Sequence, residues 1–283
     1  AMNQQMWHHP ATQANARLLT ERGVRLLGPA AGAQACGEVG PGRMLEPEDI
    51  VAALRKTQQA SPLAGRRILI TAGPTREALD PMRYVGNRSS GRMGYALAEA
   101  LAERGAEVIL VSGPTALAAP LNVERIQVES ALEMHSVVMG CIVEQEIFIA
   151  AAAVADYRVA DPAPQKIKKG QQELVLRLVR NPDILAEVAA RPTPPFTVGF
   201  AAETERVEEQ ALIKLRAKGL DMIAANRVAG PQGGFEREDN ALTILWRDGR
   251  REPLPLMPKA RLAEALTDLI AETYAAQVAD QGA

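Results

Sequence analysis

A run of small residues, SSGRMG at residues 89–94, separates an apolar segment that starts at Arg66 from a helical pattern that ends at Gly105. A strand, a small-residue turn and a helix N-terminus together form an arrangement that binds phosphate. Free backbone N–H groups and the helix dipole both favour an anion there. The spacing differs from GxGxxG, and glycines also occur in βα turns that bind nothing. The turn alone therefore leaves nucleotide binding open.

The connection before this turn is long for a βα loop, because it runs from residue 74 to residue 88. Long loops in compact domains are either functional or disordered. Here the aromatic residue and the paired arginines argue against disorder, so we predict a polar, ligand-contacting loop. The side chains suited to ligand contact are Thr75, Arg76, Asp80, Arg83, Tyr84, Asn87 and Arg88.

A lysine-rich segment, DPAPQKIKKG at residues 161–170, follows a run of alanines that ends in Asp156. Its prolines and glycine exclude regular structure. A lysine run is most often a solvated loop. This one, however, leaves the predicted ligand end of the sheet, where a mobile basic loop can fold over a triphosphate. The alanines permit either close helix packing or a substrate lying on the backbone.

Three further positions have a structural and a functional interpretation. Asn181 before Pro182 indicates a helix N-cap and a first-turn proline, which explains both residues without a ligand. Lys214 and Lys218 share a face of a predicted helix over 204–218, where the helix C-terminus favours cations. Phe200 ends a predicted buried strand and could belong to the core.

Composition narrows the class of protein. The chain has 283 residues, 47% of them hydrophobic and 23% charged, which is ordinary for a soluble globular protein. A net charge of −2 and 4% aromatic residues disfavour binding to nucleic acid or a membrane surface. The three histidines lack zinc-ligand spacing, and the sequence predicts no protein metal ligands. Two cysteines fit a reducing cytoplasm, with Cys141 predicted to pack in a helix.

Alternation of strand and helix patterns after residue 65 predicts an α/β fold. We expect a Rossmann-like, mostly parallel sheet with helices on both faces and a projecting C-terminal hairpin. The predicted strands are 66–72, 107–111, 124–128, 147–153, 196–201 and 221–225, the hairpin is 242–246 with 252–257, and the helices are 91–104, 131–145, 204–218 and 258–275. Ligands of such sheets lie beyond the carboxyl ends of the strands.

Residues 1–64 form a separate predicted domain, and residues 65–283 form the second. The first should contain helices over 11–22 and 46–59, a strand over 24–27 and a glycine-rich loop. Such a unit is too small to hold a core by itself. Residues 57–64 (TQQASPLA) are typical of a linker.

Several motifs resemble one known family when they are taken together. The motifs, in chain order, are TAGPTRE, DPMRYVGNRSSGRMG, AAAVADYR, KIKK, NPDI, VGFAAET and KGLDMIAAN. As a set they are similar to phosphopantothenoylcysteine synthetase, the second half of bacterial bifunctional coenzyme A biosynthesis proteins. The resemblance covers roughly residues 65–257. Each motif alone is weak, but the ordered set is highly specific.

The resemblance implies an enzyme that ligates 4′-phosphopantothenate to L-cysteine through an acyl-cytidylate, using CTP and Mg²⁺, in a cytoplasmic homodimer. It makes Lys166 and Asn87 the catalytic residues. It places Arg83 (from the dimer partner), Asn87, Ala152 and Ala153 at phosphopantothenate. It places at CTP the residues Ala150, Ala151, Ala152, Asp156, Lys166, Asn181, Pro182, Asp183, Ile184, Phe200, Lys214 and Lys218.

The first 64 residues resemble the end of the FMN-dependent decarboxylase that forms the other half of those proteins. By this resemblance, Asn3 and Met6 belong to a substrate clamp and Cys36 is a proton donor. Glu38 stands where that family usually has aspartate. The strands that hold FMN and the decarboxylase histidine have no counterpart in these residues. We therefore expect no decarboxylation from this chain and an idle thiol at Cys36.

Two other functions remain to be tested against this one. A nicotinamide-dependent oxidoreductase needs an acidic residue at the end of the second strand to hold the ribose. The sequence has Val111-Ser112-Gly113 there, which disfavours it. A non-catalytic assembly subunit would use residues 1–64 to dock a partner.

Overall fold

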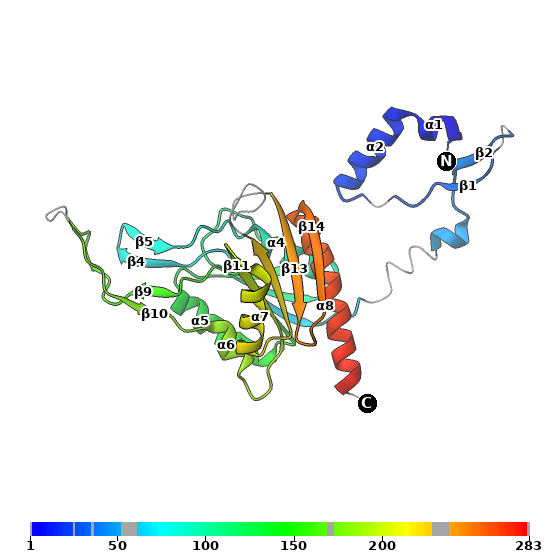
Figure 1. Cartoon of the computed structure of the whole chain (residues 1–283). Coiled ribbons are helices and arrows are strands. Elements are labelled where there is room, and N and C mark those ends of the chain that lie inside the picture. Colours follow the sequence, from blue (N-terminus) through cyan, green and yellow to red (C-terminus); the bar gives the residue numbers. More distant parts are fainter. Residues whose placement is uncertain are drawn as a thin grey trace. The chain divides into compact units, whose positions relative to one another are not determined.

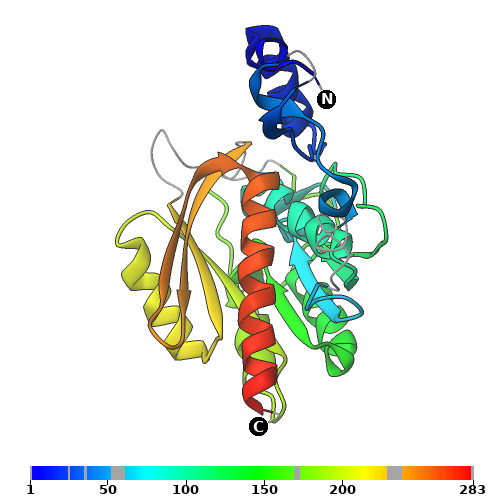
Figure 2. The same cartoon turned by 90° about the vertical axis from the view of Figure 1, so that its right-hand side faces the viewer.

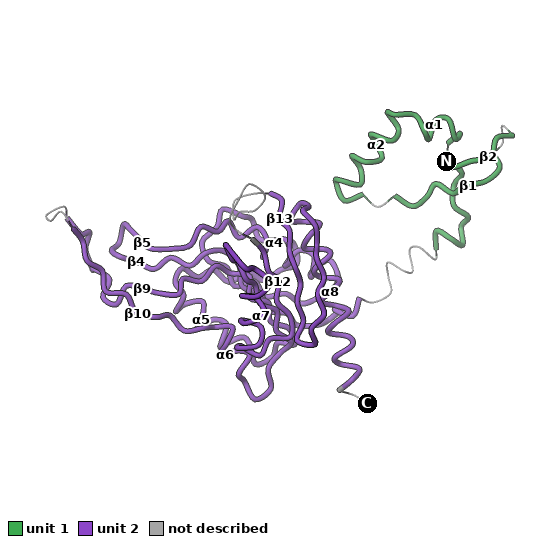
Figure 3. Tube along the Cα trace, in the orientation of Figure 1, with its two compact units in different colours: residues 1–60 green, residues 61–283 purple. Residues whose placement is uncertain are grey.

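The computed structural model describes residues 2–24, 26–34, 37–51, 61–168, 173–227 and 238–281. The chain forms two compact units, residues 1–60 and residues 61–283 (Figure 3). Cys36, residues 52–60, and with them most of the predicted helix over 46–59 and half of the predicted linker, lie outside the described residues.

The first unit contains two helices and a hairpin. The helices are α1 (Gln4–His8) and α2 (Pro10–Glu21), and neither buries a residue. Strands β1 (Ala30–Ala33) and β2 (Val39–Arg43) pair antiparallel, and residues 47–51 are helical. The helix predicted over 11–22 is confirmed. The strand predicted over 24–27 is wrong, because residues 24, 26 and 27 lie in no strand.

The glycine-rich segment of this unit forms the hairpin, where the sequence analysis expected a loop. Its glycines permit close contact with the start of the chain. The N–H of Met2 donates to the carbonyl of Gly42 at 2.7 Å, and a side chain on Gly40 would collide with Gln4. The small residues therefore indicate tight backbone packing, which a loop interpretation misses.

The second unit is built on an eight-stranded sheet with the order β14-β13-β12-β11-β8-β3-β6-β7 (Figure 1). Six neighbouring strands are parallel: β12 (Met222–Arg227), β11 (Phe196–Glu203), β8 (Ile147–Ala150), β3 (Arg67–Ala72), β6 (Glu107–Ser112) and β7 (Val123–Gln127). The predicted mostly parallel, Rossmann-like sheet is confirmed. The predicted C-terminal hairpin, β13 (Asp239–Trp246) and β14 (Arg251–Pro258), is present and extends the sheet as its antiparallel edge.

Helices cover both faces of this sheet. Helices α4 (Arg92–Glu103) and α8 (Lys259–Gln281) pack on one face, where α8 runs along the sheet (Figure 2). On the other face lie α5 (Ala131–Cys141), a short 3₁₀ turn η1 (Ile142–Glu144), α6 (Ile184–Ala189) and α7 (Val207–Lys218).

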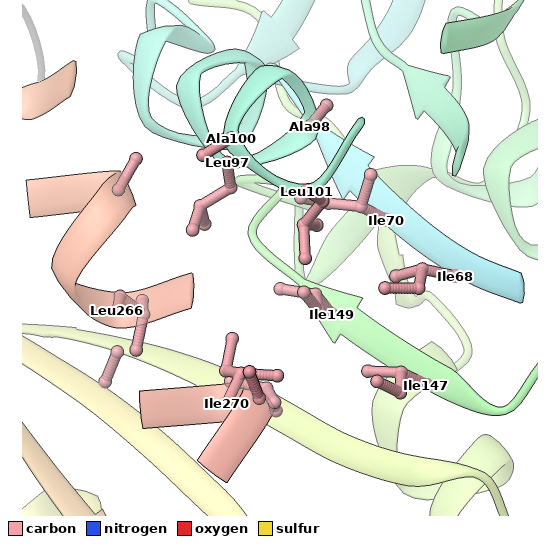
Figure 4. Packing of buried hydrophobic residues seen from close by; sticks show 14 of the residues in the cluster. Ile68, Ile70, Leu97, Ala98, Ala100, Leu101, Ile147, Ile149, Leu266 and Ile270 are labelled. Carbon is pink, nitrogen blue, oxygen red and sulfur yellow. The ribbon is translucent and has the colours of Figure 1, made fainter. Parts of the chain in front are cut away.

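Alternate strand residues supply the two cores, because successive side chains of a strand point to opposite faces. Ile68 and Ile70 pack with Leu97 and Leu266 on the α4–α8 face (Figure 4). Leu69 belongs instead to the cluster under α5 and α6. This parity also decides which face each residue at the strand ends can reach.

Two strand pairs project from the sheet as arms (Figure 1). The first pairs β4 (Arg76–Asp80) with β5 (Arg83–Gly86), and the second pairs β9 (Tyr157–Val159) with β10 (Leu178–Arg180). The prediction of a loop over residues 74–88 is therefore wrong, because most of this segment forms a β-hairpin. Local hydrogen bonds explain the hairpin, since Asp80 Oδ1 accepts from the N–H of Met82 at 2.8 Å and of Arg83 at 2.9 Å, which closes a tight turn.

Two glycines in helices of this unit differ in their surroundings and give a test of the packing. A Cβ on Gly94 would lie 2.5 Å from Ala72 Cβ, whereas a Cβ on Gly140 would meet nothing within 4 Å. We expect Gly94→Ala to lower the free energy of unfolding by about 1–3 kcal/mol through overpacking. Gly140→Ala should raise it by up to about 1 kcal/mol through helix propensity. Denaturant unfolding of both variants checks this, and equal effects would contradict the close approach of α4 to β3.

Candidate functional site

A cavity of about 450 Å³ opens beside the carboxyl ends of β3, β8 and β11. We call it the first cavity. Residues 150, 152 and 154 line it and pack against the α5–α6 cluster, so it lies on the α5–α6 side of the sheet. It collects most of the residues that the sequence analysis assigned to a nucleotide, namely Ala150, Ala152, Asp156, Asn181, Pro182, Asp183, Ile184, Phe200 and Lys218.

A second cavity, of about 380 Å³, adjoins the first. Its wall includes the N-terminal turn of α4 at residues 89–94 and Ala151, which packs against the α4–α8 core. The residues predicted for the site that line it are Asn87, Ala151, Ala152, Ala153, Asp156, Phe200 and Lys214.

The two cavities share Ala152, Val154, Asp156 and Phe200. The packing of this segment fits the arrangement, because Ala152 and Val154 pack with the α5–α6 cluster, whereas Ala151 packs with the α4–α8 core. The sheet edge is therefore a thin partition between two sites that meet over the end of β8. A reaction between two bound molecules fits this geometry.

Two threonines hold the alanine segment after it leaves the sheet. Thr71 Oγ1 accepts from the N–H of Ala152 at 3.3 Å, and Thr75 Oγ1 accepts from the N–H of Ala155 at 2.9 Å. Both threonines are at most 3% exposed. The strand predicted over 147–153 ends at Ala150. Beyond it, the N–H groups of Ala151 and Ala153 still donate to the carbonyls of Thr71 and Gly73, and the threonine hydroxyls accept from the N–H groups of Ala152 and Ala155.

Asn87, which directly follows β5, contacts the same alanine segment. Its amide Nδ2 donates to the carbonyl of Ala153 at 3.2 Å and to that of Val154 at 3.0 Å. The structure thus assembles Asn87, Ala152 and Ala153 in the second cavity.

The N-cap of α6 is Asp183, so the prediction of Asn181 as the cap is wrong. Asp183 accepts from the N–H of Ala186 at 3.1 Å. Asn181 instead donates its amide to the carbonyl of Ala155 at 2.8 Å, because the chain must first turn back from β10. Both side chains line the first cavity all the same.

The two lysines of α7 reach different cavities, although they share a helix face. Lys218 lines the first cavity and pairs with Asp183 at 2.7 Å between Nζ and Oδ2. Lys214 lines the second cavity and pairs with Glu203 at 3.2 Å. Each cation is therefore balanced by a carboxylate that a more highly charged anion could displace.

Two predicted site residues are not brought to the cavities. Lys166 is exposed and lines neither cavity. Arg83 is held by Asp80, with 3.0 Å between Nε and Oδ2, and donates to the carbonyl of Ile167 at 3.0 Å. Cys36 lies outside the described residues.

Several polar residues of the second cavity were missed from the sequence, namely Arg92, Asn226, Asn240 and Lys259. Asn226 was detectable, because it follows a predicted parallel strand. Lys259 carried a subtler signal, since a lysine at the first residue of a helix opposes the helix dipole. It is only 8% exposed, and burial together with the nearby Arg92 lowers the pKa of its ammonium group. Cations crowded in this way suit an anionic ligand.

The place where a dinucleotide-binding protein holds the ribose is filled here. Ser112 at the end of β6 is buried and shares a hydrogen bond with the Tyr95 hydroxyl at 2.9 Å. A side chain on Gly113 would collide with the carbonyl of Pro74. These contacts agree with the sequence argument against a nicotinamide cofactor.

The described part of the chain contains neither a cluster of metal-ligating side chains nor a helix that could cross a membrane. Its histidine, cysteine, aspartate and glutamate residues form no group of three or more that could hold a metal ion. Among the same residues, none of the helices has the length and apolar character needed to cross a membrane.

Residues 63–274 match the family described as the DNA/pantothenate metabolism flavoprotein C-terminal domain. The chain belongs to this family. Residues 1–59 match a second family, described as Flavoprotein. The resemblance drawn from the ordered motifs is thereby confirmed.

The relatives include bifunctional coenzyme A biosynthesis proteins named CoaBC. The protein of Vibrio cholerae is 56% identical over 275 residues, which cover 96% of this chain and 69% of that one. The protein of Escherichia coli K12 is 50% identical over 279 residues, covering 97% and 68%. This chain thus spans about two thirds of the length of these relatives.

Solved structures agree with the fold. The C-terminal domain of a CoaBC protein is 43% identical, with a TM-score of 0.64 over 75% of this chain and 97% of that one. A Cab2 variant in complex with phosphopantothenate-cysteine has a TM-score of 0.63 at 14% identity. At that identity the likeness concerns the fold alone.

The charges of the second cavity predict anion binding that depends on Lys259. We expect the chain to bind inorganic pyrophosphate, and Lys259→Met to weaken that binding about tenfold or more, because a partly buried charge is poorly screened. Arg261→Met is the matched control, since Arg261 lies two residues further along α8 and forms an exposed pair with Glu264. Calorimetric titration measures both. Equal affinities for the two variants would contradict this role of Lys259.

Proposed function

We propose that the second unit is a phosphopantothenate–cysteine ligase that uses CTP. The observation that carries the proposal is the pair of cavities that meet at Ala152, Asp156 and Phe200. Most of the residues assigned to the nucleotide line the first cavity, whereas Asn87 and Ala153, assigned to phosphopantothenate, line only the second. Such a division suits an acid that must meet the α-phosphate of a nucleotide.

The reaction proceeds in two steps. A carboxylate does not acylate an amine unaided, because its oxygen is a poor leaving group. In the first step a carboxylate oxygen of 4′-phosphopantothenate attacks the α-phosphorus of CTP, the bond to the bridging oxygen breaks, and pyrophosphate leaves. In the second step the cysteine amine attacks the acyl carbon, CMP leaves with the bonding electrons, and the amine proton passes to solvent. The products are 4′-phosphopantothenoylcysteine, CMP and pyrophosphate.

The protein contributes mainly position and charge. Lys218 and Lys214 exchange their carboxylate partners for phosphate oxygens, and Asp156 contacts the nucleotide where the cavities join. The amide of Asn87, which lies against the carbonyls of the alanine segment, holds the acyl intermediate for the second step. Mg²⁺, when bound, neutralises phosphate charge and is held largely by phosphates and water.

Lys166 is proposed to contact the phosphates during activation. It stands on an exposed loop next to Ile167, and lysine is suited to this role as a mobile point charge. CTP is proposed as the nucleotide because the bifunctional relatives are bacterial, and the resemblance to the bacterial bifunctional type implies CTP. The enzyme is proposed to work in the cytoplasm.

A homodimer is proposed through the projecting arms. All four residues of β5 are exposed, including Tyr84 and Val85, and Met82 in the preceding turn is 67% exposed. Tyr157 and Leu178 are exposed on the second arm. A second copy of the chain that covers these apolar side chains would also bring its Arg83 near the phosphopantothenate site.

The first unit is proposed to belong to a flavoprotein decarboxylase domain that binds FMN in the complete bifunctional proteins. Its match to the Flavoprotein family supports this. The proposed domains are residues 1–64 and 65–283. A docking role for the first unit without catalysis is the alternative, and size-exclusion chromatography with the relatives' flavin domain separates the two.

Product analysis tests the ligase directly. We expect mass spectrometry to find 4′-phosphopantothenoylcysteine, CMP and pyrophosphate after incubation with CTP, L-cysteine, 4′-phosphopantothenate and Mg²⁺. In Lys166→Gln the rate of pyrophosphate release should fall by about 10²-fold or more, the scale of one lost electrostatic contact to a transition state. Lys168→Gln, two residues away and exposed, is the control. Full activity in Lys166→Gln would remove the lysine from this role.

The dimer can be tested with a charge on the first arm. We expect Val85→Lys to dissociate the dimer, because a cation buried at an apolar interface loses its hydration. Activity should fall with it if Arg83 acts across the interface. Val143→Lys, at a position 72% exposed on the 3₁₀ turn, should change neither. Analytical ultracentrifugation reads the result, and a Val85→Lys dimer of native affinity would exclude this interface.

A further inference from the structure

Asp80 ends β4, and its carboxylate joins two segments that lie 87 residues apart in the sequence. Oδ1 accepts from the N–H of Met82 and of Arg83, which shapes the hairpin turn. Oδ2 accepts from Arg83 Nε at 3.0 Å and from the N–H of Ile167 at 3.1 Å. The side chain of Asp80 is fully buried by these partners.

Further contacts hold the lysine-bearing loop at the same turn. The N–H of Ala163 donates to the carbonyl of Leu79 at 2.8 Å. The guanidinium of Arg83 donates to the carbonyl of Ile167 at 3.0 Å. Ile167 is thus bonded through both its N–H and its carbonyl, while the side chain of its neighbour Lys166 points to solvent and is exposed. The backbone beneath Lys166 is therefore fixed although its side chain is not.

We propose that Asp80 is a positioning residue for the activation step. Its carboxylate holds both the guanidinium of Arg83 and the backbone that carries Lys166. The inference rests on the ligase function proposed above, and it replaces the ligand contact expected for Asp80 from the sequence with a positioning role. Asp80 lines neither cavity, so it acts through the two cations that it places.

The chemistry of the position requires an ionised carboxylate. All five hydrogen bonds to the carboxylate of Asp80 come from N–H donors, two of them from the guanidinium of Arg83, and only an acceptor without a proton satisfies them all. The hydrogen bond from Arg83, helped by the amides of Ile167 and Met82, holds the pKa of Asp80 well below its usual range. An asparagine here would place an NH₂ group where one of the two carboxylate oxygens lies. The N–H donors that face this oxygen would then have no acceptor.

A double-mutant cycle on pyrophosphate release tests the proposal, with Asp80→Asn, Lys166→Gln and the double variant in the full chain. We expect Asp80→Asn alone to lower kcat about 10²-fold with little change in KM for CTP, the scale that misplacing a catalytic group produces. In the Lys166→Gln background the same change should cost clearly less than it does alone, because the part of the loss that acts through Lys166 is already gone and only the part that acts through Arg83 remains. Additive losses would overturn the role of Asp80.

Glu77→Gln is the matched control. Glu77 lies on the same strand and is 3% exposed, but its carboxylate accepts from the N–H of Ala131 at the start of α5, away from the lysine loop. Glu77→Gln should lower the rate of pyrophosphate release by the same factor in the native chain and in the Lys166→Gln variant. If Asp80→Asn does not fold, Ile167→Pro removes the same N–H···O bond from the other side and enters the same cycle with the same expectation.

Amide hydrogen exchange supplies a readout that needs no activity. We expect the Ile167 amide to lose protection in Asp80→Asn and to keep it in Glu77→Gln. Unchanged protection in Asp80→Asn would overturn the anchoring, whether or not the enzyme turns over. An absence of pyrophosphate release by the native chain would instead refute the ligase function, so the two failures are told apart.

Discussion

The site depends on how the chain satisfies its backbone polar groups after β8 leaves the sheet. A strand end at a sheet edge exposes N–H groups, and side chains large enough to shield them would fill the space needed by a ligand. Here the hydroxyls of Thr71 and Thr75 accept two of these N–H groups from within the core, and the N–H of Ala153 donates to the carbonyl of Gly73 at 2.8 Å. Alanine side chains then suffice at the surface, and both cavities open directly onto them.

This solution also explains why one segment can serve two cavities. Ala150 and Ala152 pack on one face and Ala151 on the other, and Ala152 lines both cavities, so ligands in the two cavities contact the same few residues. The hydrogen bonds of Asn87 to the carbonyls of Ala153 and Val154 fix the far end of the segment. A reaction between two bound molecules is accelerated by such fixed placement, because the translational and rotational entropy of the reactants is already lost when they bind.

The sequence predicted those features that short-range patterns determine. Apolar runs and glycine stops located the parallel strands and the main helices, and the resemblance of the ordered motifs to a known family assigned Asp156, Phe200 and Asn181 to one site, whose cavity they line. The hairpin at 76–86 was missed although the Asp80 turn that closes it is local. The other features that the sequence could not predict depended on distant partners. Asn181 does not cap α6 because its amide binds the carbonyl of Ala155, and Lys259 reaches the second cavity only because α8 starts there. The glycines of the first unit misled for the same reason, since their partner is the start of the chain.

The ion pairs around the site separate into two kinds, and the difference bears on function. The carboxylates of Lys218–Asp183 and Lys214–Glu203 are 51% and 24% exposed, whereas that of Asp80 is fully buried although its partner Arg83 is 47% exposed. Ion pairs whose carboxylate is open to solvent contribute little to stability. A polyanion can displace their carboxylates at a small cost in free energy, so both lysines can bind phosphate oxygens instead. The carboxylate of Asp80 is fully buried and also binds three backbone N–H groups. Removing its partner would strand a buried charge, which is costly, so this pair persists while the others exchange. That contrast is why Asp80 fits the role of an anchor and the cavity carboxylates fit the role of placeholders for phosphate.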